Sequence, residues 1–143
     1  LGLRWPNDLV VEGRKVGGIL VESGPEVRWV VVGVGINVAV AADQLPEGAT
    51  SLQETVRGPV DRAALLQALL SELEIAYELF RGGDWATLLD WWRRRSTTLG
   101  RRVRVYVPSG VYEGVAEDVD EDGALVLRLP DGRRKRIVAG EVD

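Results

Sequence analysis

The stretch "RWPNDLVVEGRKVGGILVE", Arg4 to Glu22, decides how the first part of the chain folds. It holds two β-rich runs joined by "EGR", which predicts a hairpin turn at Gly13. Pro6 ends the strand that precedes them, because proline cannot donate a hydrogen bond to a β-ladder. A core strand needs neither the polar pair Asn7-Asp8 nor the glycine pair Gly17-Gly18. The hairpin is therefore arranged around something small and polar.

The following segments predict one more strand, a long loop and two helices. The almost wholly apolar run from Val27 to Asn37 is typical of a strand buried on both faces. Residues 38–59 are rich in turn formers and predict a long loop of the kind that is often functional or mobile. Asp61 and Asp84 are expected to cap the two helices. Apolar residues recur at helical spacing in both and are expected to be core: Leu65, Leu66, Leu69, Leu73, Tyr77 and Phe80, then Trp85, Leu88, Leu89 and Trp92.

After Gly100 the pattern changes to short alternating strands, "RVRVYV", "VYEGVAEDV", "ALVLRL" and "RKRIV". Evenly spaced short strands with turns between them indicate a small barrel. Its expected core residues are Val103, Val105, Val115, Val119, Leu125, Leu127 and Ile137. The sequence therefore predicts an α+β chain with two domains, residues 1–98 and residues 99–143.

Composition excludes several classes of chemistry. The 143 residues include no Cys and no His, which rules out thiolate nucleophiles, Ser-His catalysis and Cys-bound zinc. A net charge of −4 gives no general attraction to nucleic acid. The most apolar segment, Trp29 to Ala42, is shorter than the roughly 20 residues of a membrane span. We expect a cytoplasmic protein without a membrane partner, and a fragment, because the chain starts at Leu1 within a strand pattern.

Lys15 and the pair Asn7-Asp8 each allow two interpretations. Lys15 begins an apolar strand after a tight turn, and a lysine on an edge strand often only deters aggregation. Alternatively, its charge faces a phosphate or carboxylate, with Gly17 and Gly18 letting the ligand approach the backbone. Asn7 and Asp8 either form a turn or present an amide and a carboxylate at the end of a strand.

Three other motifs favour structural interpretations. "GVGIN" (Gly33–Asn37) fails as a dinucleotide motif, because Val38 stands where the last glycine is needed. Its glycines serve either a neighbouring backbone or a flat ligand. "DVDEDG" from Asp118 opens like a calcium loop, but Leu129 replaces the bidentate Glu, which favours a solvated turn. The basic runs 93–95 and 133–136 are typical of solvated faces, although a basic barrel could also bind an acidic partner.

Taken in order, "RWPNDLVVEGRKVGGILVE", "VVVGVGINV" and "ATSLQE" resemble the second half of a biotin protein ligase, the family of biotin–[acetyl-CoA-carboxylase] ligases. The resemblance covers essentially the whole chain. It implies part of a class II synthetase-like mixed sheet with helices, followed by an SH3-like barrel. Arg4 stands where the family usually has Lys, which keeps the charge but changes its geometry. The family's glycine- and arginine-rich loop and the winged-helix DNA-binding domain of its bifunctional members are expected upstream of Leu1, so this chain alone is expected to be inactive and not to bind DNA.

The resemblance also implies a function and a set of site residues. Biotin and ATP would give biotinyl-AMP, and a lysine of a biotin carboxyl carrier domain would then take the biotin. Lys15 would be the catalytic residue and would bridge the biotin carboxylate and the α-phosphate. Gly17 and Gly18 would line the biotin site. Asn7, Asp8 and Asn37 would contact the adenylate, and Asp8 would also help to hold Mg²⁺ with ATP.

Two alternatives stay open at this stage. A lipoate or octanoate ligase would share the fold and the acyl-adenylate chemistry, and its distinguishing pocket contacts would lie upstream. A non-enzymatic module with a nucleic-acid-binding barrel would instead predict binding that weakens steeply with salt. The sequence does not determine the oligomeric state, and a homodimer is compatible with it.

Overall fold

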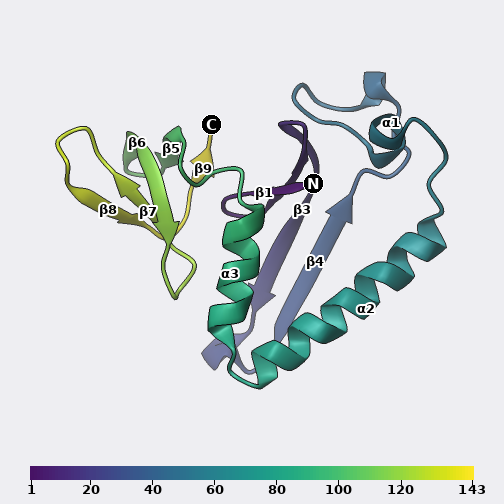
Figure 1. Ribbon diagram of the computed structural model, residues 1–143, viewed down its shortest axis with the longest axis horizontal. Coiled ribbons are helices and arrows are strands. Elements are labelled where there is room, and N and C mark those ends of the chain that lie inside the picture. Colours follow the sequence, from purple (N-terminus) through teal and green to yellow (C-terminus); the bar gives the residue numbers. More distant parts are fainter. The chain divides into compact units, whose positions relative to one another are not determined.

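The computed structural model describes residues 1–143, which form two compact units (Figure 1). The first unit comprises residues 1–2 and 7–66, and the second comprises residues 3–6 and 67–143. The predicted domain boundary between residues 98 and 99 stays a prediction. None of the helices is long and apolar enough to cross a membrane.

A four-stranded sheet with the order β1-β2-β3-β4 dominates the first part of the chain. Its strands are β1 (Gly2–Arg4), β2 (Asp8–Val11), β3 (Arg14–Ser23) and β4 (Val30–Ile36). The hairpin predicted at Gly13 is present, because β2 and β3 pair antiparallel on either side of it. Gly13 has a φ of 78°, a left-handed conformation that favours glycine at this turn. β4 pairs antiparallel with β3, and the short 3₁₀ helix η1 (Pro25–Val27) precedes it.

Residues 38–59 were predicted to be a long loop, and the structure corrects this interpretation. The segment contains the 3₁₀ helix η2 (Ala42–Gln44) and the α-helix α1 (Leu52–Val56). Ser51 caps α1 by accepting a hydrogen bond from the Glu54 N–H at 3.4 Å. Thr50 and Ser51 are completely buried. The part of the segment around them is therefore packed rather than open to solvent.

Both predicted helix caps are present. Helix α2 (Arg62–Arg81) begins after Asp61, whose carboxylate accepts hydrogen bonds from the N–H groups of Ala63 and Ala64. Helix α3 (Trp85–Arg95) begins after Asp84, which accepts from the Thr87 N–H at 3.2 Å. No residue of either helix is fully buried, which corrects the expected core for the apolar face of α2, whereas Leu89 and Trp92 of α3 are partly buried against the barrel core. The side chains left exposed include Leu66, Leu73, Tyr77, Phe80 and Trp85.

The second unit contains a five-stranded antiparallel barrel, with the strand order β8-β7-β6-β5-β9. Its strands are β5 (Arg102–Val107), β6 (Gly110–Val119), β7 (Leu125–Arg128), β8 (Arg134–Ile137) and β9 (Glu141–Val142). Six of the seven predicted core residues are buried, and Val115 is the exception. Ala116 is buried instead, because a bulge at Glu117 changes the register of β6 against β7.

Helix α3 and Trp5 share the core of this unit. Leu89 and Trp92 pack against the barrel core, and Trp5 belongs to it with 4% of its surface exposed. Arg93 joins α3 to β6 through two hydrogen bonds to the Asp118 carboxylate and one to the Val119 carbonyl, at 2.7–3.0 Å. The helix is therefore fixed to the barrel by both apolar packing and a bidentate ion pair.

Candidate active site

A β-bulge in the first hairpin determines where Lys15 points. Leu9 pairs with Gly17 and Val10 pairs with Lys15, so Val16 is an extra residue on β3. In a regular strand Lys15 and Gly18 would face opposite sides, because side chains alternate. The extra residue reverses this relation. The Nζ atom of Lys15 lies 3.7 Å from the position that a Cβ atom on Gly18 would occupy, so its ammonium group lies on the Gly18 face.

Asp8 holds the ammonium group of Lys15 on that face. Asp8 pairs with Gly18 across the hairpin, and its carboxylate lies 2.5 Å from the Lys15 Nζ atom. The Asp8 side chain is 15% exposed, whereas that of Lys15 is 47% exposed. The pair therefore has a largely buried anion and a cation that remains accessible to a ligand.

The main chain of Lys15 is held separately by residues 48–50. The Lys15 N–H donates to the Gly48 carbonyl, and the Thr50 N–H donates to the Lys15 carbonyl, each at 2.8 Å. Because Thr50 is completely buried, this contact is anchored in the interior of the unit. The segment predicted to be a long loop therefore supports the backbone of Lys15, the residue predicted to be catalytic.

Asn7 and Asn37 use their side-chain amides to hold neighbouring backbone. The Asn7 Nδ2 group donates to the Ile19 carbonyl at 2.9 Å, and the Ile19 N–H donates back to the Asn7 carbonyl. The Asn37 Nδ2 group donates to the Thr50 carbonyl at 3.2 Å. Asn7 thus ties the segment before β2 to β3, and Asn37 ties the end of β4 to Thr50. Contact of either residue with a nucleotide stays a prediction.

Three glycines form the floor of a shallow hollow on the face that carries Lys15. Gly18 pairs with Gly35 and Leu20 pairs with Gly33, and residues paired across a sheet share a face. A Cβ atom on Gly33 or Gly35 would meet no atom closer than 3.6 Å, so both floor positions are open. The hollow measures about 460 Å³ and is lined by Asn7, Gly18, Ile19, Leu20, Gly33, Val34 and Gly35.

Gly17 does not line this hollow, and its predicted place in the biotin site with Gly18 stays a prediction. A Cβ atom on Gly17 would lie 2.3 Å from the Gly35 carbonyl oxygen, so glycine is needed for the close approach of β3 and β4. Gly33 and Gly35 line the hollow instead. The glycines of "GVGIN" had suggested a flat ligand, but only the strand register assigns them to the same face as Gly18.

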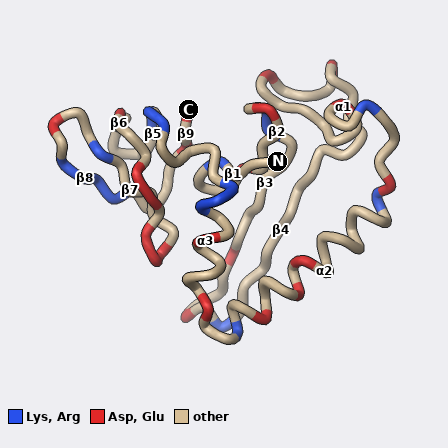
Figure 2. Tube along the Cα trace, in the orientation of Figure 1, with Lys and Arg blue, Asp and Glu red and all other residues tan.

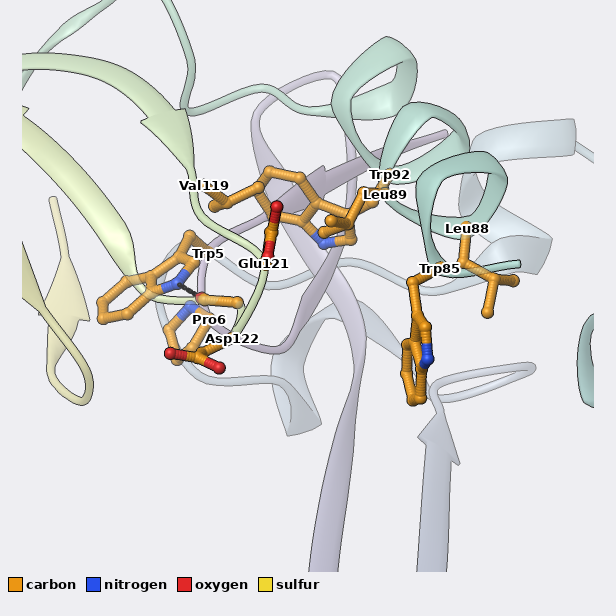
Figure 3. A pocket seen from close by; sticks show the side chains of 10 residues that line it. Trp5, Pro6, Trp85, Leu88, Leu89, Trp92, Val119, Glu121 and Asp122 are labelled. Atoms are coloured by element: carbon orange, nitrogen blue, oxygen red, sulfur yellow. Dashed lines mark hydrogen bonds between the residues drawn. The ribbon is translucent and has the colours of Figure 1, made fainter. Parts of the chain in front are cut away.

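A second cavity, of about 350 Å³, lies between α3 and the barrel within the second unit (Figure 3). Its lining includes Trp5, Trp85 and Trp92, and no Lys or Arg lines it. Trp5 donates hydrogen bonds to the Gly123 carbonyl through its indole and to the Thr98 hydroxyl through its backbone N–H, both at 3.0 Å. This cavity lacks the positive charge that a phosphate or carboxylate requires.

Acidic and basic segments lie close together in the barrel (Figure 2), and the arginines of the run 133–136 pair with carboxylates. Glu117 accepts hydrogen bonds from Arg128 and Arg134, which lower the pKa of Glu117 below its ordinary value. Arg136 pairs with Asp120 and Asp122, and its hydrogen bond lowers the pKa of Asp120. Further pairs join Arg133 to Asp131 and Arg104 to Glu113. The barrel therefore carries paired charges rather than a continuous cationic patch.

Comparisons with known proteins find a separate family match for the N-terminal part and for the C-terminal part of the chain. Residues 98–143 match the family described as "Biotin protein ligase C terminal domain", and residues 2–37 match the "Biotin/lipoate A/B protein ligase family". The chain is 39% identical to the biotin–[acetyl-CoA-carboxylase] ligase of Mycobacterium tuberculosis, covering 99% of this chain and 52% of the relative. It is 35% identical to the ligase of the same name from Paracoccus denitrificans, covering 99% of this chain and 62% of the relative.

A solved structure of similar fold is the biotin protein ligase of Aquifex aeolicus in complex with biotin and ATP. It matches with a TM-score of 0.82 and 27% identity, over 99% of this chain and 60% of that one. This chain therefore spans between about half and two thirds of the length of these three proteins. Both halves of the chain match in sequence and in structure, and on this evidence the chain belongs to the biotin protein ligase family.

Proposed function

We propose that this chain supplies the sheet on which a biotin protein ligase activates biotin with ATP. In the first step a carboxylate oxygen of biotin attacks the α-phosphorus of ATP, biotinyl-AMP forms and pyrophosphate leaves. In the second step a lysine amine of a carrier domain attacks the acyl carbon, an amide forms and AMP leaves. The proposed protein partner is a biotin carboxyl carrier domain of a carboxylase, and assembly as a homodimer is part of the same hypothesis.

The first step suits the residues of this chain. The attacking carboxylate is already ionised, so no general base is needed, and catalysis consists of positioning and charge neutralisation. Two anions repel each other as they approach, and a fixed cation between them lowers that repulsion. Lys15 would occupy this position, because its ammonium group lies beside Gly18 at the end of the glycine hollow. This placement is the observation that carries the proposal.

The glycine floor would let a flat ring lie against the backbone. Gly33 and Gly35 leave space above the sheet, and Leu20 adds an apolar contact on the same face. Asp8 would restrain Lys15 without cancelling its role, because the Lys15 side chain remains about half exposed. Asn37 would act through the Thr50 segment that supports the Lys15 backbone.

Magnesium would accompany ATP as the counter-ion of its phosphates. Mg²⁺ is usually held by one or two carboxylates together with phosphate oxygens and water. No group of three metal-ligating side chains occurs in residues 1–143, and the Asp8 carboxylate is paired with Lys15. The chain therefore does not form a protein-only site for the ion.

Biotin is favoured over lipoate by the C-terminal part of the chain and by the names of the relatives. Residues 98–143 match a domain described for biotin ligases, whereas the match of residues 2–37 is to a family that includes both activities. The nucleic-acid-binding alternative is disfavoured by the ion pairs that occupy the arginines of the barrel.

A chimaera tests the proposal. This chain would replace the matching 142 residues of the M. tuberculosis ligase, and pyrophosphate release would be measured with ATP and either biotin or lipoate. We expect biotin-dependent release followed by labelling of a carrier domain. Release with lipoate alone would contradict the biotin assignment. A folded chimaera that is inactive with both acids would contradict the proposed role of the sheet.

A further inference from the structure

The cavity between α3 and the barrel has no part in the proposed reaction, and it has the size of a small-molecule site. Its volume of about 350 Å³ falls within the range of ligand cavities in proteins. All of its lining residues belong to the second unit (Figure 3). Three of the five tryptophans of the chain line it, together with leucines of α3.

Hydrogen bonds fix the wall that the turn of residues 120–123 contributes to this cavity. The Trp5 indole N–H donates to the Gly123 carbonyl at 3.0 Å, which ties the turn to a buried ring. The Asp120 carboxylate accepts from two backbone N–H groups, those of residues 122 and 124, at 3.0 and 2.9 Å. Glu121 lies within this bonded turn, so its position beside the cavity is set before any ligand arrives.

The charged groups that line the cavity are both carboxylates, those of Glu121 and Asp122. Asp122 pairs with Arg136 at 2.6 Å, whereas Glu121 has no hydrogen-bond or ion-pair partner in residues 1–143. An adjoining hollow adds the cation of Arg93, but Asp118 already binds that guanidinium at 2.7 Å. The cavity therefore presents an uncompensated negative charge beside aromatic rings.

Burial differs between the residues that line the cavity. Trp5 and Val119 are buried in the core of the unit, with 4% and 2% of their surfaces exposed. Trp85 is 52% exposed, and Glu121 is also exposed. In the view of Figure 3, Glu121 lies between Trp5 and Trp85. An occupant would therefore place its apolar part against the buried residues and its charged part near solvent and Glu121.

This lining favours a ligand that is both cationic and apolar. Indole rings attract cations to their faces, because the π-electrons make each face negative. A carboxylate without a partner adds to this attraction, whereas an anion would be repelled. We propose that the cavity binds a small organic ammonium ion, with its head group beside Glu121 and the exposed indole and its apolar chain against the buried side chains. Biotin and ATP are both anions, so this site is distinct from the one proposed for them.

Three probes that share a six-carbon chain test the chemistry of the site: hexylammonium, hexanol and hexanoate. Each is titrated into the 143-residue chain while the indole N–H signals of the tryptophans are followed by NMR. We expect hexylammonium to bind with a dissociation constant of about 1 mM and to shift the signals of Trp85 and Trp92. Hexanoate should bind at least about tenfold more weakly. Equal affinity for the three probes would overturn the proposal, because the cavity would then recognise only the apolar chain.

Two matched pairs of variants locate the binding site. Glu121→Gln removes the unpaired charge, and Glu141→Gln makes the same change on β9, outside the cavity. Trp85→Leu removes an indole that is 52% exposed, and Trp29→Leu removes one that is 54% exposed in the first unit. We expect Glu121→Gln and Trp85→Leu each to weaken hexylammonium binding about fivefold, and both controls to stay within about twofold. Equal effects within either pair would refute the assignment of the site.

Repeating the titration with the chimaera tests the site in a full-length enzyme. We expect hexylammonium to bind there with an affinity within about threefold of that for the 143-residue chain. Loss of binding in a folded chimaera would overturn the proposal, because other parts of the enzyme would then fill the cavity. The readout is ligand binding and needs no turnover, so an inactive chimaera would contradict the proposed function without affecting this result.

Discussion

Replacing Lys15 with alanine in the chimaera is the sharpest test of the candidate site. The change removes the ammonium group 2.5 Å from the Asp8 carboxylate and leaves the backbone bonds to Gly48 and Thr50 in place. Lys15 fills no core volume, since its side chain is about half exposed. The fold should therefore persist, and the effect should appear in the chemistry.

The cost in stability can be bounded from the geometry of the pair. Exposed ion pairs contribute about 0–1 kcal/mol, and a mostly buried carboxylate left without its cation costs somewhat more. Because Asp8 is mostly buried and Lys15 is not, we expect a loss of about 1 kcal/mol in the free energy of unfolding. Asp8→Asn in the same background should relieve part of this loss, because the amide needs no counter-charge.

The cost in rate should be larger. Losing one preorganised charge contact in an enzyme typically costs about a hundredfold or more, which corresponds to about 2.7 kcal/mol of transition-state stabilisation. We expect Lys15→Ala to slow biotinyl-AMP formation by at least that factor. Lys15→Arg should recover little, because a planar guanidinium does not replace a compact ammonium between two anions.

Single-turnover measurement of biotinyl-AMP formation separates these effects from product release. Arg14→Ala is the matched control, since Arg14 is the neighbouring cation and its 3.8 Å contact is with Glu54. We expect the control to keep the parental rate. If Lys15→Ala forms the adenylate within about threefold of the parental rate, Lys15 is only an edge lysine and the proposed role is wrong.

Four further predictions follow from the same geometry. Gly35→Ala should fold normally but weaken biotin binding by about tenfold, whereas Gly17→Ala should cost about 1–3 kcal/mol in stability through its clash with the Gly35 carbonyl; denaturation and ligand titration of the two variants distinguish these effects. Because the pKa values of Glu117 and Asp120 are lowered from 4.5 and 3.8, the stability that these carboxylates contribute is complete above those values and is lost as the pH falls through the lower folded values. The Tm of the parent should therefore fall more steeply on acidification below about pH 4 than the Tm of Glu117→Gln, whose amide does not titrate, and equal slopes would contradict this prediction. Hydrogen exchange in the chimaera should be fastest in residues 38–47 and should slow with biotinyl-AMP, while Thr50 and Ser51 stay protected throughout; equal exchange with and without ligand would show that residues 38–47 do not order around the adenylate. Calorimetry should detect no micromolar calcium binding at residues 118–122, because Asp118, Asp120 and Asp122 are paired with arginines, and a measurable affinity would overturn this expectation.

The barrel could be predicted from sequence because alternation encodes its buried face directly. Each strand is short, one side is apolar, and tight turns separate the strands, so the pattern needs no knowledge of distant residues. Val115 is the instructive error. A single extra residue at Glu117 shifts the register, so Ala116 is buried and Glu117 faces the arginines. Alternation alone carries no signal for a bulge.

The apolar faces of β4 and α2 show a different limit. Each apolar pattern requires a covering surface, and the apolar face of each element was therefore expected to lie in a core. In the structure Val32 and Leu73 are both about half exposed. A periodic pattern thus predicts the element and its buried face, but it cannot state whether the chain itself supplies the covering layer.

The candidate site was predictable as a set of residues but not as an arrangement. Lys15, Asp8 and Gly18 do come together, and the family motif identified all three. Gly17 and Gly18 are adjacent and the motif does not distinguish them, yet they have different roles. Gly17 permits the close contact of β3 with β4, whereas Gly18 borders the hollow. Only the register of β3 against β4 separates these two uses of glycine.

The ammonium group of Lys15 is held by three independent constraints, and their combination explains why so many neighbouring positions are polar or small. The bulge at Val16 determines which face of the sheet Lys15 lies on, and the Asp8 carboxylate holds the Lys15 ammonium group. The Gly48–Thr50 segment holds the Lys15 backbone through two hydrogen bonds. Electrostatic catalysis depends on charges that are already in place when the transition state forms, because reorganisation at that moment would consume the gain. Asn37 extends this support to the loop, since its amide holds the Thr50 carbonyl. If Lys15 has the proposed role, Asp8 and Asn37 would act on the reaction by fixing this cation, without touching the ligand themselves.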